Sequence, residues 1–118
     1  MSYVHRFSDG SPCDLPLGKV VCVGRNYAAH AKELNNPVPS TPMLFIKPAT
    51  AVVSLDGSIA VPKDRGACHH ELEVSVLIGG VLTNSSPEAV KQAIVGYGLG
   101  LDLTLRDVQN TLKEKGHP

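Results

Sequence analysis

Two glutamates separated by one residue, Glu71 and Glu73, have the spacing that most directly suggests chemistry in this sequence. They lie in residues 68–78, where apolar and polar side chains alternate, a pattern that predicts a β-strand. Residues two apart on a strand point to the same side, about 6.5 to 7 Å apart at Cα. Carboxylates that close repel each other unless positive charge lies between them, and a divalent cation would supply it. The simpler alternative is that both glutamates face solvent on an ordinary strand. The rest of the sequence is needed to choose between a cation site and this alternative.

A third carboxylate, Asp102, ends a run in which glycines alternate with large apolar residues. On the predicted strand over residues 95–104, one face carries apolar side chains and the other carries Gly96, Gly98, Gly100 and Asp102. Glycine weakens a strand and tends to mark the close approach of a ligand or another backbone. Three carboxylates suit a hard cation such as Mg²⁺, Mn²⁺ or Ca²⁺, and leave coordination positions for water and substrate. The alternative for Asp102 is a capping role at the helix that follows.

A histidine and a glutamate form a second candidate pair. His30 and Glu33 are three residues apart in a short helix predicted to begin near Tyr27, so they share one helix face. A carboxylate beside an imidazole fixes its tautomer and raises its basicity, which suits a general base. Surface helices also carry such pairs without any catalytic role.

Three further side chains are candidates to hold an anionic substrate, namely Arg25, Arg106 and Gln109. Arg106 and Gln109 are three residues apart and share a face of a predicted helix; solvent exposure is the alternative for both. The adjacent Cys68, His69 and His70 offer a rival site with soft ligands. It lacks a second ligand cluster at zinc spacing, and we interpret these residues as ordinary strand positions, with one histidine as a supporting contact.

The composition excludes several classes of function. The chain has 118 residues, enough for one domain at most, and Lys+Arg and Asp+Glu both number 11. Without a basic excess, neither nucleic acid nor an anionic membrane is an expected partner. The N-terminus has no apolar signal core, and the apolar runs are too short to span a membrane. The 3 scattered cysteines favour free thiols in a reducing cytosol, so we expect a cytoplasmic protein.

The predicted elements are mainly strands, with short helices between them. Strands are expected at residues 19–23, 43–47, 68–78 and 95–104, with a hairpin at Asp56-Gly57 and helices near residues 27–34, 86–93 and 103–115. Ser86 and Pro87 are a typical helix start, and Gly116 is a typical helix end. The two long strands each present a large apolar face, and the remaining segments are too few to cover both. We therefore expect a piece of a longer chain, or a subunit that another chain completes.

The motifs, taken in order, resemble the fumarylacetoacetate hydrolase superfamily, and within it the small acylpyruvate hydrolases and oxaloacetate decarboxylases. The matching strings are Gly24-Arg25-Asn26-Tyr27 with His30 and Glu33, His70-Glu71-Leu72-Glu73, Gly98 to Thr104 with Arg106-Asp107-Val108-Gln109, and Lys115-Gly116-His117-Pro118. The resemblance covers nearly the whole chain from about Lys19 onward.

This resemblance implies an α+β, mostly β fold, a mixed β-roll that residues 1–118 would represent as the N-terminal portion of one catalytic domain. It implies Mg²⁺ or Mn²⁺ held by Glu71, Glu73 and Asp102, a lid carrying His30 and Glu33, and a homodimer. Members of the family are roughly twice as long, and the second half would supply more sheet, a catalytic lysine and a threonine-bearing loop. The fold is thus expected to be incomplete at the C-terminal end.

The implied activity is metal-dependent hydrolysis of a C–C bond in 2,4-dioxo acids such as fumarylpyruvate or acetylpyruvate, with oxaloacetate decarboxylation as a related reaction. Arg25, Arg106 and Gln109 would help to hold the oxo acid, and His30, oriented by Glu33, would activate water. Two alternatives stay open. One is an isomerase, hydratase or decarboxylase of dienoic oxo acids in aromatic catabolism, because the ligand triad would be shared. The other is an inactive fragment.

Overall fold

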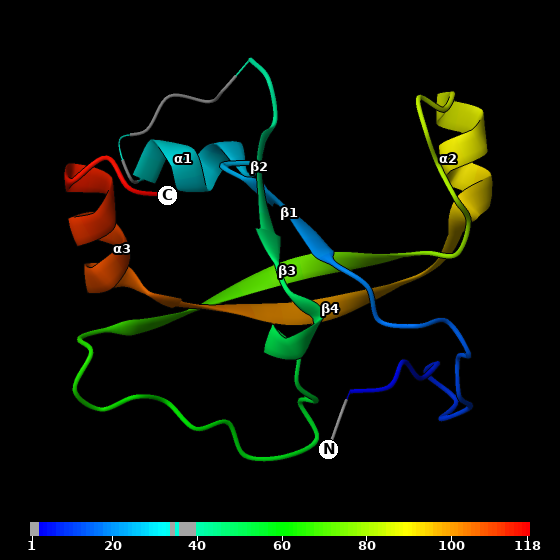
Figure 1. Ribbon diagram of the computed structural model, residues 1–118, viewed down its shortest axis with the longest axis horizontal. Helices are drawn as coiled ribbons and strands as arrows, with labels where there is room; N and C mark the ends of the chain where they lie inside the picture. The colour runs from blue at the N-terminus through cyan, green and yellow to red at the C-terminus, as the bar shows by residue number, and fades with distance from the viewer. Residues whose placement is uncertain (1–2, 34, 36–39) are drawn as a thin grey trace. The chain divides into compact units, whose positions relative to one another are not determined.

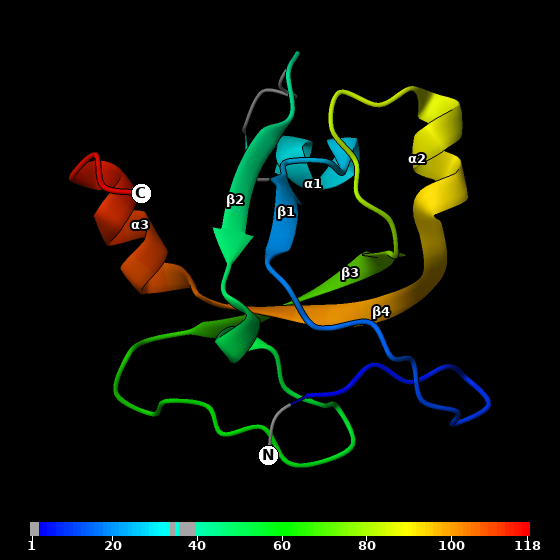
Figure 2. The same ribbon diagram turned by 45° about the vertical axis from the view of Figure 1, so that its right-hand side comes forward.

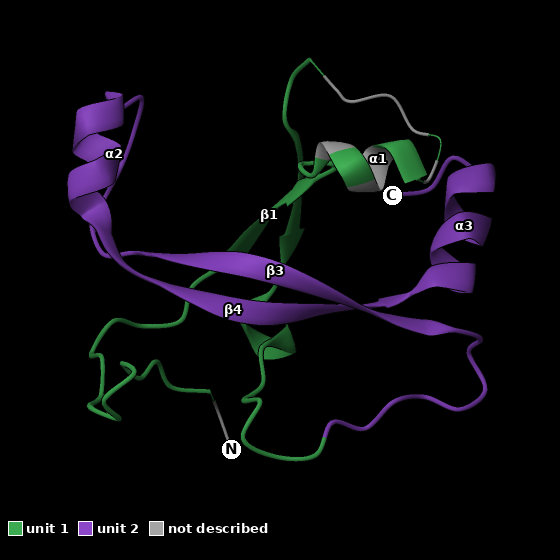
Figure 3. Ribbon diagram, turned by 180° about the vertical axis from the view of Figure 1, so that it is seen from behind, with its two compact units in different colours: residues 1–58 green, residues 59–118 purple. Residues whose placement is uncertain are grey.

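The computed structural model describes residues 3–33, 35 and 40–118, except for the side chains of residues 28, 30 and 31. The chain forms two compact units, Met1–Ser58 and Ile59–Pro118, which are coloured separately in Figure 3 and are described one at a time. Within the described residues the fold is α+β and mostly β, as the sequence predicts.

The first unit contains a short antiparallel strand pair. Strand β1, Val20–Gly24, pairs with β2, Met43–Lys47, and helix α1, Ala28–Glu33, follows β1 along the chain (Figure 2). Gly24 stands opposite Met43, and a β-carbon at Gly24 would collide with the Met43 methyl group. The left-handed residue that turns the chain out of β1 is Arg25, with φ at 54°, which is uncommon for a residue other than glycine.

The hairpin predicted at Asp56-Gly57 is wrong. Strand β2 leads into a 3-10 helix, η1, Ala49–Ala51, and residues 52–67 contain no strand. Ser54 and Asp56 form a local turn instead: the Ser54 hydroxyl donates to the Asp56 carboxylate at 2.9 Å and accepts from the Asp56 backbone N–H at 3.1 Å. Turn residues alone do not make a hairpin when the flanking segments find no mutual pairing.

A long antiparallel ribbon dominates the second unit. Strand β3, Cys68–Ile78, pairs with β4, Ile94–Leu105, in continuous register from Cys68 opposite Leu105 to Leu77 opposite Gly96 (Figure 1). The register shifts between Leu77 and Ile78, close to the end of the ribbon where the connection through α2 begins. The predicted β3 segment agrees with the observed strand residue for residue.

Two helices flank this ribbon in sequence, and their ends follow the predicted capping chemistry. Helix α2, Pro87–Ala93, has Ser86 at its N-cap, where the hydroxyl accepts from the Ala89 N–H at 3.2 Å. Helix α3, Arg106–Glu114, begins later than predicted because residues 103–105 still belong to β4. It ends in a Schellman motif: Gly116, at φ 70°, donates to Lys113, and His117 donates to Leu112.

Little of the apolar side-chain surface is covered by the described residues themselves. Among them, Cys13 is the one buried hydrophobic side chain, at 6% exposure, and the three cysteines are free thiols, as predicted. Large apolar residues on β3 and β4 are widely exposed, including Leu72 at 63%, Leu99 at 67% and Tyr97 at 73%. The hydrophobic core of a stable domain is therefore not assembled by these residues alone.

Candidate metal centre

The strand register places two of the three predicted carboxylates opposite each other. Glu71 on β3 pairs with Asp102 on β4, and Glu73 pairs with Gly100. Directly opposed residues on an antiparallel pair share a face, with Cβ atoms about 5 Å apart. Glu71, Glu73 and Asp102 thus occupy one face of the ribbon, and all three are half-buried rather than fully solvated. The simple solvated-face explanation does not describe this surface.

The glycines of β4 keep this face open. A β-carbon built at Gly100 would meet nothing within 4 Å, whereas one at Gly98 would touch the Ser75 hydroxyl at 3.0 Å. Gly100 stands opposite Glu73, so no side chain of β4 fills the space beside that carboxylate. The glycine face therefore leaves room for a ligand next to the acidic residues.

Arg106, the first residue of α3, lies over the acidic face and contacts three side chains. Its Nη2 forms an ion pair with Glu71 Oε1, its Nη1 donates to Gln109 Oε1 at 2.6 Å, and its Nε donates to His69 Nδ1 at 3.2 Å. The ion pair is partly shielded from water, with the Arg106 and Glu71 side chains 16% and 26% exposed. Arg106 and Gln109 share a helix face as predicted; Arg106 contacts Glu71 on the strand, and Gln109 contacts Arg106.

The sequence predicts one histidine as a supporting contact without saying which, and the structure shows that His69 contacts Arg106. His69 shares the ribbon face of Glu71 and Glu73, whereas His70 lies on the apolar face, because side chains alternate along β3. The His69 Nδ1 accepts the hydrogen bond from Arg106 Nε at 3.2 Å. The period-two spacing of residues 69, 71 and 73 could have revealed it, but the contact also requires the helix to begin at Arg106.

The three carboxylates share a face without yet converging. In the part of the chain that the structure describes, no three His, Cys, Asp or Glu side chains are grouped so that they could hold a metal ion. The same finding gives no support to a soft-metal site at Cys68, His69 and His70. The Arg106 guanidinium beside Glu71 offsets the repulsion between this carboxylate and those of Asp102 and Glu73.

These residues nevertheless fit a divalent cation by their chemistry, and the backbone places them on one face. The backbone register fixes Glu71 beside Asp102 and places Glu73 on the same face. The Arg106 guanidinium, bound to Glu71, shows that this position accommodates positive charge. Carboxylate oxygens are the ligands that Mg²⁺ and Mn²⁺ prefer. The roles assigned to Glu71, Glu73 and Asp102 remain predictions.

The capping alternative for Asp102 is wrong. The N-cap of α3 is Leu105, which makes no side-chain capping bond, and Asp102 lies within β4. In the first turn of this helix the Asp107 carboxylate accepts a hydrogen bond from the Ala67 backbone N–H at 2.9 Å. That contact ties the beginning of α3 to the turn that leads into β3, and so keeps Arg106 beside the ribbon.

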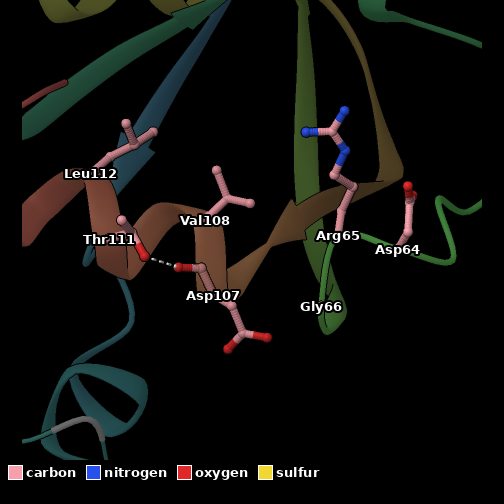
Figure 4. A pocket seen from close by; sticks show the side chains of 7 residues that line it. All are labelled: Asp64, Arg65, Gly66, Asp107, Val108, Thr111 and Leu112. Carbon is pink, nitrogen blue, oxygen red and sulfur yellow. Dashed lines mark hydrogen bonds between the residues drawn. The ribbon is translucent and has the colours of Figure 1, made fainter.

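An open hollow of about 400 Å³ lies on the side of α3 that carries Asp107. Figure 4 shows the seven residues that line it, Asp64, Arg65, Gly66, Asp107, Val108, Thr111 and Leu112. None of the three predicted metal ligands is among them. The Thr111 hydroxyl donates to the Asp107 backbone carbonyl at 3.0 Å, so these polar groups serve the helix itself. We do not assign the hollow to the acidic site.

The predicted catalytic pair lies in the first unit. His30 and Glu33 both fall in α1, as expected, but the His30 side chain lies outside the described part of the structure. Glu33 is exposed, and Arg25 is half-buried just before this helix. Their roles as general base, orienting residue and substrate ligand therefore stay predictions.

Comparison with known proteins identifies the family. Residues 19–117 match the C-terminal domain of fumarylacetoacetate hydrolase. The chain is 52% identical over 116 residues to an oxaloacetate tautomerase of Escherichia coli (strain K12), covering 98% of this chain and 53% of that protein. It is also 43% identical over 99 residues to a mitochondrial oxaloacetate tautomerase of Homo sapiens, covering 84% of this chain and 45% of that protein.

Solved structures agree with the sequence matches. A Yersinia pestis CO92 protein assigned to the fumarylacetoacetate hydrolase family superposes with a TM-score of 0.93 at 48% identity, over 98% of this chain and 54% of its own. A fumarylpyruvate hydrolase from Pseudomonas aeruginosa, solved with Mn²⁺ and pyruvate, superposes with a TM-score of 0.78 at 39% identity, over 90% of this chain and 48% of its own.

The chain belongs to the fumarylacetoacetate hydrolase family, which confirms the resemblance read from its motifs. It spans 53% and 45% of the two relatives named above, about half their length. No helix among the described residues is long and apolar enough to cross a membrane.

Proposed function

We propose that the whole protein is a Mg²⁺- or Mn²⁺-dependent enzyme that interconverts the keto and enol forms of a short oxo acid, with oxaloacetate as the first candidate substrate. The observation that carries this proposal is the cross-strand pairing of Glu71 with Asp102, with Glu73 on the same face. The names of two relatives that are 52% and 43% identical supply the substrate. The Mn²⁺ bound to the fumarylpyruvate hydrolase supports the choice of metal.

In this proposal Glu71, Glu73 and Asp102 would hold the cation, which would supply Lewis acidity to the oxygen atoms of the oxo acid. Arg106 and Gln109 stand beside the acidic face and would bind a carboxylate of the substrate, since a guanidinium matches a carboxylate in two-point geometry. Arg25 would add a second positive contact. His30, oriented by Glu33, would remove the proton next to the oxo group and return it to the enolate.

Hydrolysis of a C–C bond in 2,4-dioxo acids is the second candidate. It is favoured by the 39% identity to the fumarylpyruvate hydrolase and by the His30 and Glu33 spacing, which suits activation of water. Both reactions pass through an enolate, so the carboxylate face serves either one. Decarboxylation of oxaloacetate and rearrangement of dienoic oxo acids in aromatic catabolism need the same charge stabilisation and remain further alternatives.

We also propose that the protein acts as a homodimer, because its exposed apolar strand surface would be covered by association. The free thiols and the balanced charge support a cytoplasmic site of action, although relatives such as that of Homo sapiens are named as mitochondrial.

The test compares Glu71→Gln with Glu88→Gln, the same substitution at an exposed glutamate in the first turn of α2. Glu71→Gln should lose Mn²⁺ binding by calorimetry and reduce oxo-acid turnover more than about 100-fold, since changes to residues that only support a metal ligand already cost 10- to 100-fold. Glu88→Gln should change neither. Enol absorbance with oxaloacetate, and loss of diketone absorbance with an acylpyruvate, separate the two reactions. Full activity in Glu71→Gln, or in the metal-stripped protein, would refute the proposal.

A further inference from the structure

We propose that Asp107 is a positioning residue, which fixes the start of α3 against β3 so that the Arg106 guanidinium stays on the acidic face of the ribbon. It acts through a β3–α3 junction, defined by Gly66, Ala67, Arg106 and Asp107. The consequence for substrate binding rests on the proposed function, which gives Arg106 a carboxylate of the oxo acid to bind. The placement of Arg106 itself does not depend on that function.

The junction lies where the strand ladder ends. Opposed residues on an antiparallel pair can exchange two backbone hydrogen bonds, one in each direction. Cys68 opposite Leu105 is the last pair of the register, and one step beyond it the Arg106 N–H donates to the Ala67 carbonyl at 3.0 Å. In the other direction the Ala67 N–H donates to the Asp107 carboxylate at 2.9 Å. The Asp107 side chain thus takes the place of a backbone acceptor where β4 turns into α3.

The start of the helix explains why a side chain accepts this bond. Arg106 is the first residue of α3, and the carbonyl of a helical residue points along the helix axis and not across to a neighbouring strand. Asp107, one residue later, supplies an oxygen on a short side chain instead. A negative charge in the first turn also stabilises the helix dipole, and this is the alternative role for Asp107. The two roles differ because the dipole requires the charge, whereas the junction requires only the oxygen acceptor.

Gly66 provides the room for the Asp107 carboxylate. Its φ is 78°, and a β-carbon built there would collide with the Asp107 Oδ2 (Figure 4). The carboxylate therefore packs directly against the Gly66 backbone. Gly10 has a similar φ of 85°, but a β-carbon there would meet nothing within 4 Å. The two glycines share a backbone requirement, and Gly66 alone of the pair also accommodates a carboxylate.

Arg106 carries the effect of the junction to the acidic face. Its guanidinium forms an ion pair with Glu71 and donates to His69 at 3.2 Å, and both partners belong to β3. The guanidinium keeps these contacts only while the first turn of α3 holds its position against the strand. The N-cap residue Leu105 makes no side-chain capping bond that would fix this turn. The bond from Ala67 to Asp107, the residue next to Arg106, therefore secures the place of the guanidinium.

Hydrogen exchange in the unaltered whole protein tests whether the junction forms in solution. Ala67 is exposed and lies outside any helix or strand, as Ser58 does. Because its N–H is bound by Asp107, the Ala67 amide should nevertheless exchange at least about fivefold more slowly than the Ser58 amide, relative to the intrinsic rate of each. Equal protection of the two amides would overturn the inference without any substitution.

The second test follows the Arg106 Nε–H, which donates to His69, by ¹⁵N-detected exchange with water. In Asp107→Ala this exchange should become about fivefold faster, the factor of one modest hydrogen bond. Asp107→Asn keeps an oxygen acceptor and should remain within about twofold of the unaltered protein. Glu114→Ala removes an exposed acid from the last turn of the same helix and should change nothing. Equal loss of protection in the Asn and Ala variants would assign Asp107 to the helix dipole and refute the inference.

A substitution at Gly66 reaches the same junction from its other side. Gly66→Ala should speed the Arg106 Nε–H exchange as Asp107→Ala does, because the new methyl group displaces the carboxylate. Gly10→Ala imposes comparable backbone strain without the collision and should leave this exchange unchanged. In the double variant of Gly66 and Asp107 the effects should be smaller than the product of the two, since both act on one contact. Independent effects would contradict the junction. Circular dichroism checks that each variant is folded.

Turnover of oxaloacetate separates this inference from the proposed function. Asp107→Ala should raise KM about fivefold with kcat nearly unchanged, because a misplaced Arg106 weakens binding away from the reacting atoms. In an Arg106→Gln background the same substitution should change KM less than about twofold, since its effect passes through Arg106. Faster Arg106 exchange in Asp107→Ala, with KM unchanged there and in Arg106→Gln, would support the junction and refute the substrate role of Arg106. Unchanged Arg106 exchange in Asp107→Ala would overturn the inference, whatever the activity.

Discussion

The two faces of the β3–β4 ribbon are built from the same strands yet differ in what the described residues provide for them. On the face with Glu71, Glu73 and Asp102, Glu71 has a partner in Arg106 at the start of the next helix, and Arg106 is held in turn by Gln109. The opposite face carries large apolar side chains such as Leu72, Leu99 and Tyr97, and these remain largely exposed. The polar face is organised within 118 residues, and the apolar face is not.

The difference follows from the range of the interactions involved. An ion pair and two hydrogen bonds need only a few atoms at short distance, and a helix that starts where the strand ends can deliver them. Burial of an apolar sheet face needs a second layer that covers hundreds of square ångströms. Contacts between a few polar side chains can therefore form within one supersecondary unit, whereas an apolar sheet face needs a second layer to cover it.

The largest expected effect concerns the apolar face. A polypeptide of residues 1–118 alone should associate or aggregate, melt without a cooperative transition and show no oxo-acid turnover, because its apolar face is uncovered. Size-exclusion chromatography and thermal melting check this. Replacing the opposed pair Val74 and Leu99 by Lys and Glu should shift the sample toward a smaller species, since the pair would carry opposite charges. A soluble, cooperatively melting monomer of the unaltered sequence would contradict the expectation.

A smaller effect is expected on the polar face, where alanine substitutions of two glycines of β4, Gly96 and Gly100, are compared. Gly100→Ala and Gly96→Ala each add a methyl group where nothing lies within 4 Å, so neither should change the free energy of unfolding by more than about 1 kcal/mol. Gly100 stands opposite Glu73, whereas Gly96 stands opposite Leu77. Gly100→Ala should therefore weaken Mn²⁺ or substrate binding several-fold, with Gly96→Ala near the unaltered value. Equal effects would mean that the glycine run serves the strand and not a ligand.

The sequence predicted the two-faced ribbon well, because period-two alternation from residue 68 onward reports which side each residue occupies. The same alternation placed Glu71 and Glu73 on one strand face and Asp102 on the glycine face of a second strand, and the register between the two strands brings the three together. It could not predict that Arg106 reaches Glu71 and His69, since that depends on the helix beginning at Arg106 and on the Asp107 contact with Ala67. The failed hairpin at Asp56 had correct turn residues but no pairing between its flanks. Strand faces and turn residues can be predicted from the sequence, whereas contacts between segments far apart in the chain depend on the fold.

The smallest effect is expected at the connection between the two strands, which belongs to neither face. Ser86→Ala removes the hydroxyl that accepts from the Ala89 N–H at the start of α2, and an N-cap of this kind contributes about 1 kcal/mol. Denaturant unfolding should show a lower midpoint with an unchanged slope, and Ser58→Ala, at an exposed position outside any helix or strand, serves as the matched control.

Because α2 follows the end of the ribbon where the register shifts, its cap should not influence the carboxylates near the start of β3. Mn²⁺ affinity in Ser86→Ala should accordingly stay within about twofold of the unaltered protein, since sites that share no contacts behave additively. A change in affinity much larger than this, at unchanged folding, would show that the ribbon transmits strain from α2 to Glu71 and Asp102. The acidic face would then depend on the whole length of the ribbon and not only on its junction with α3.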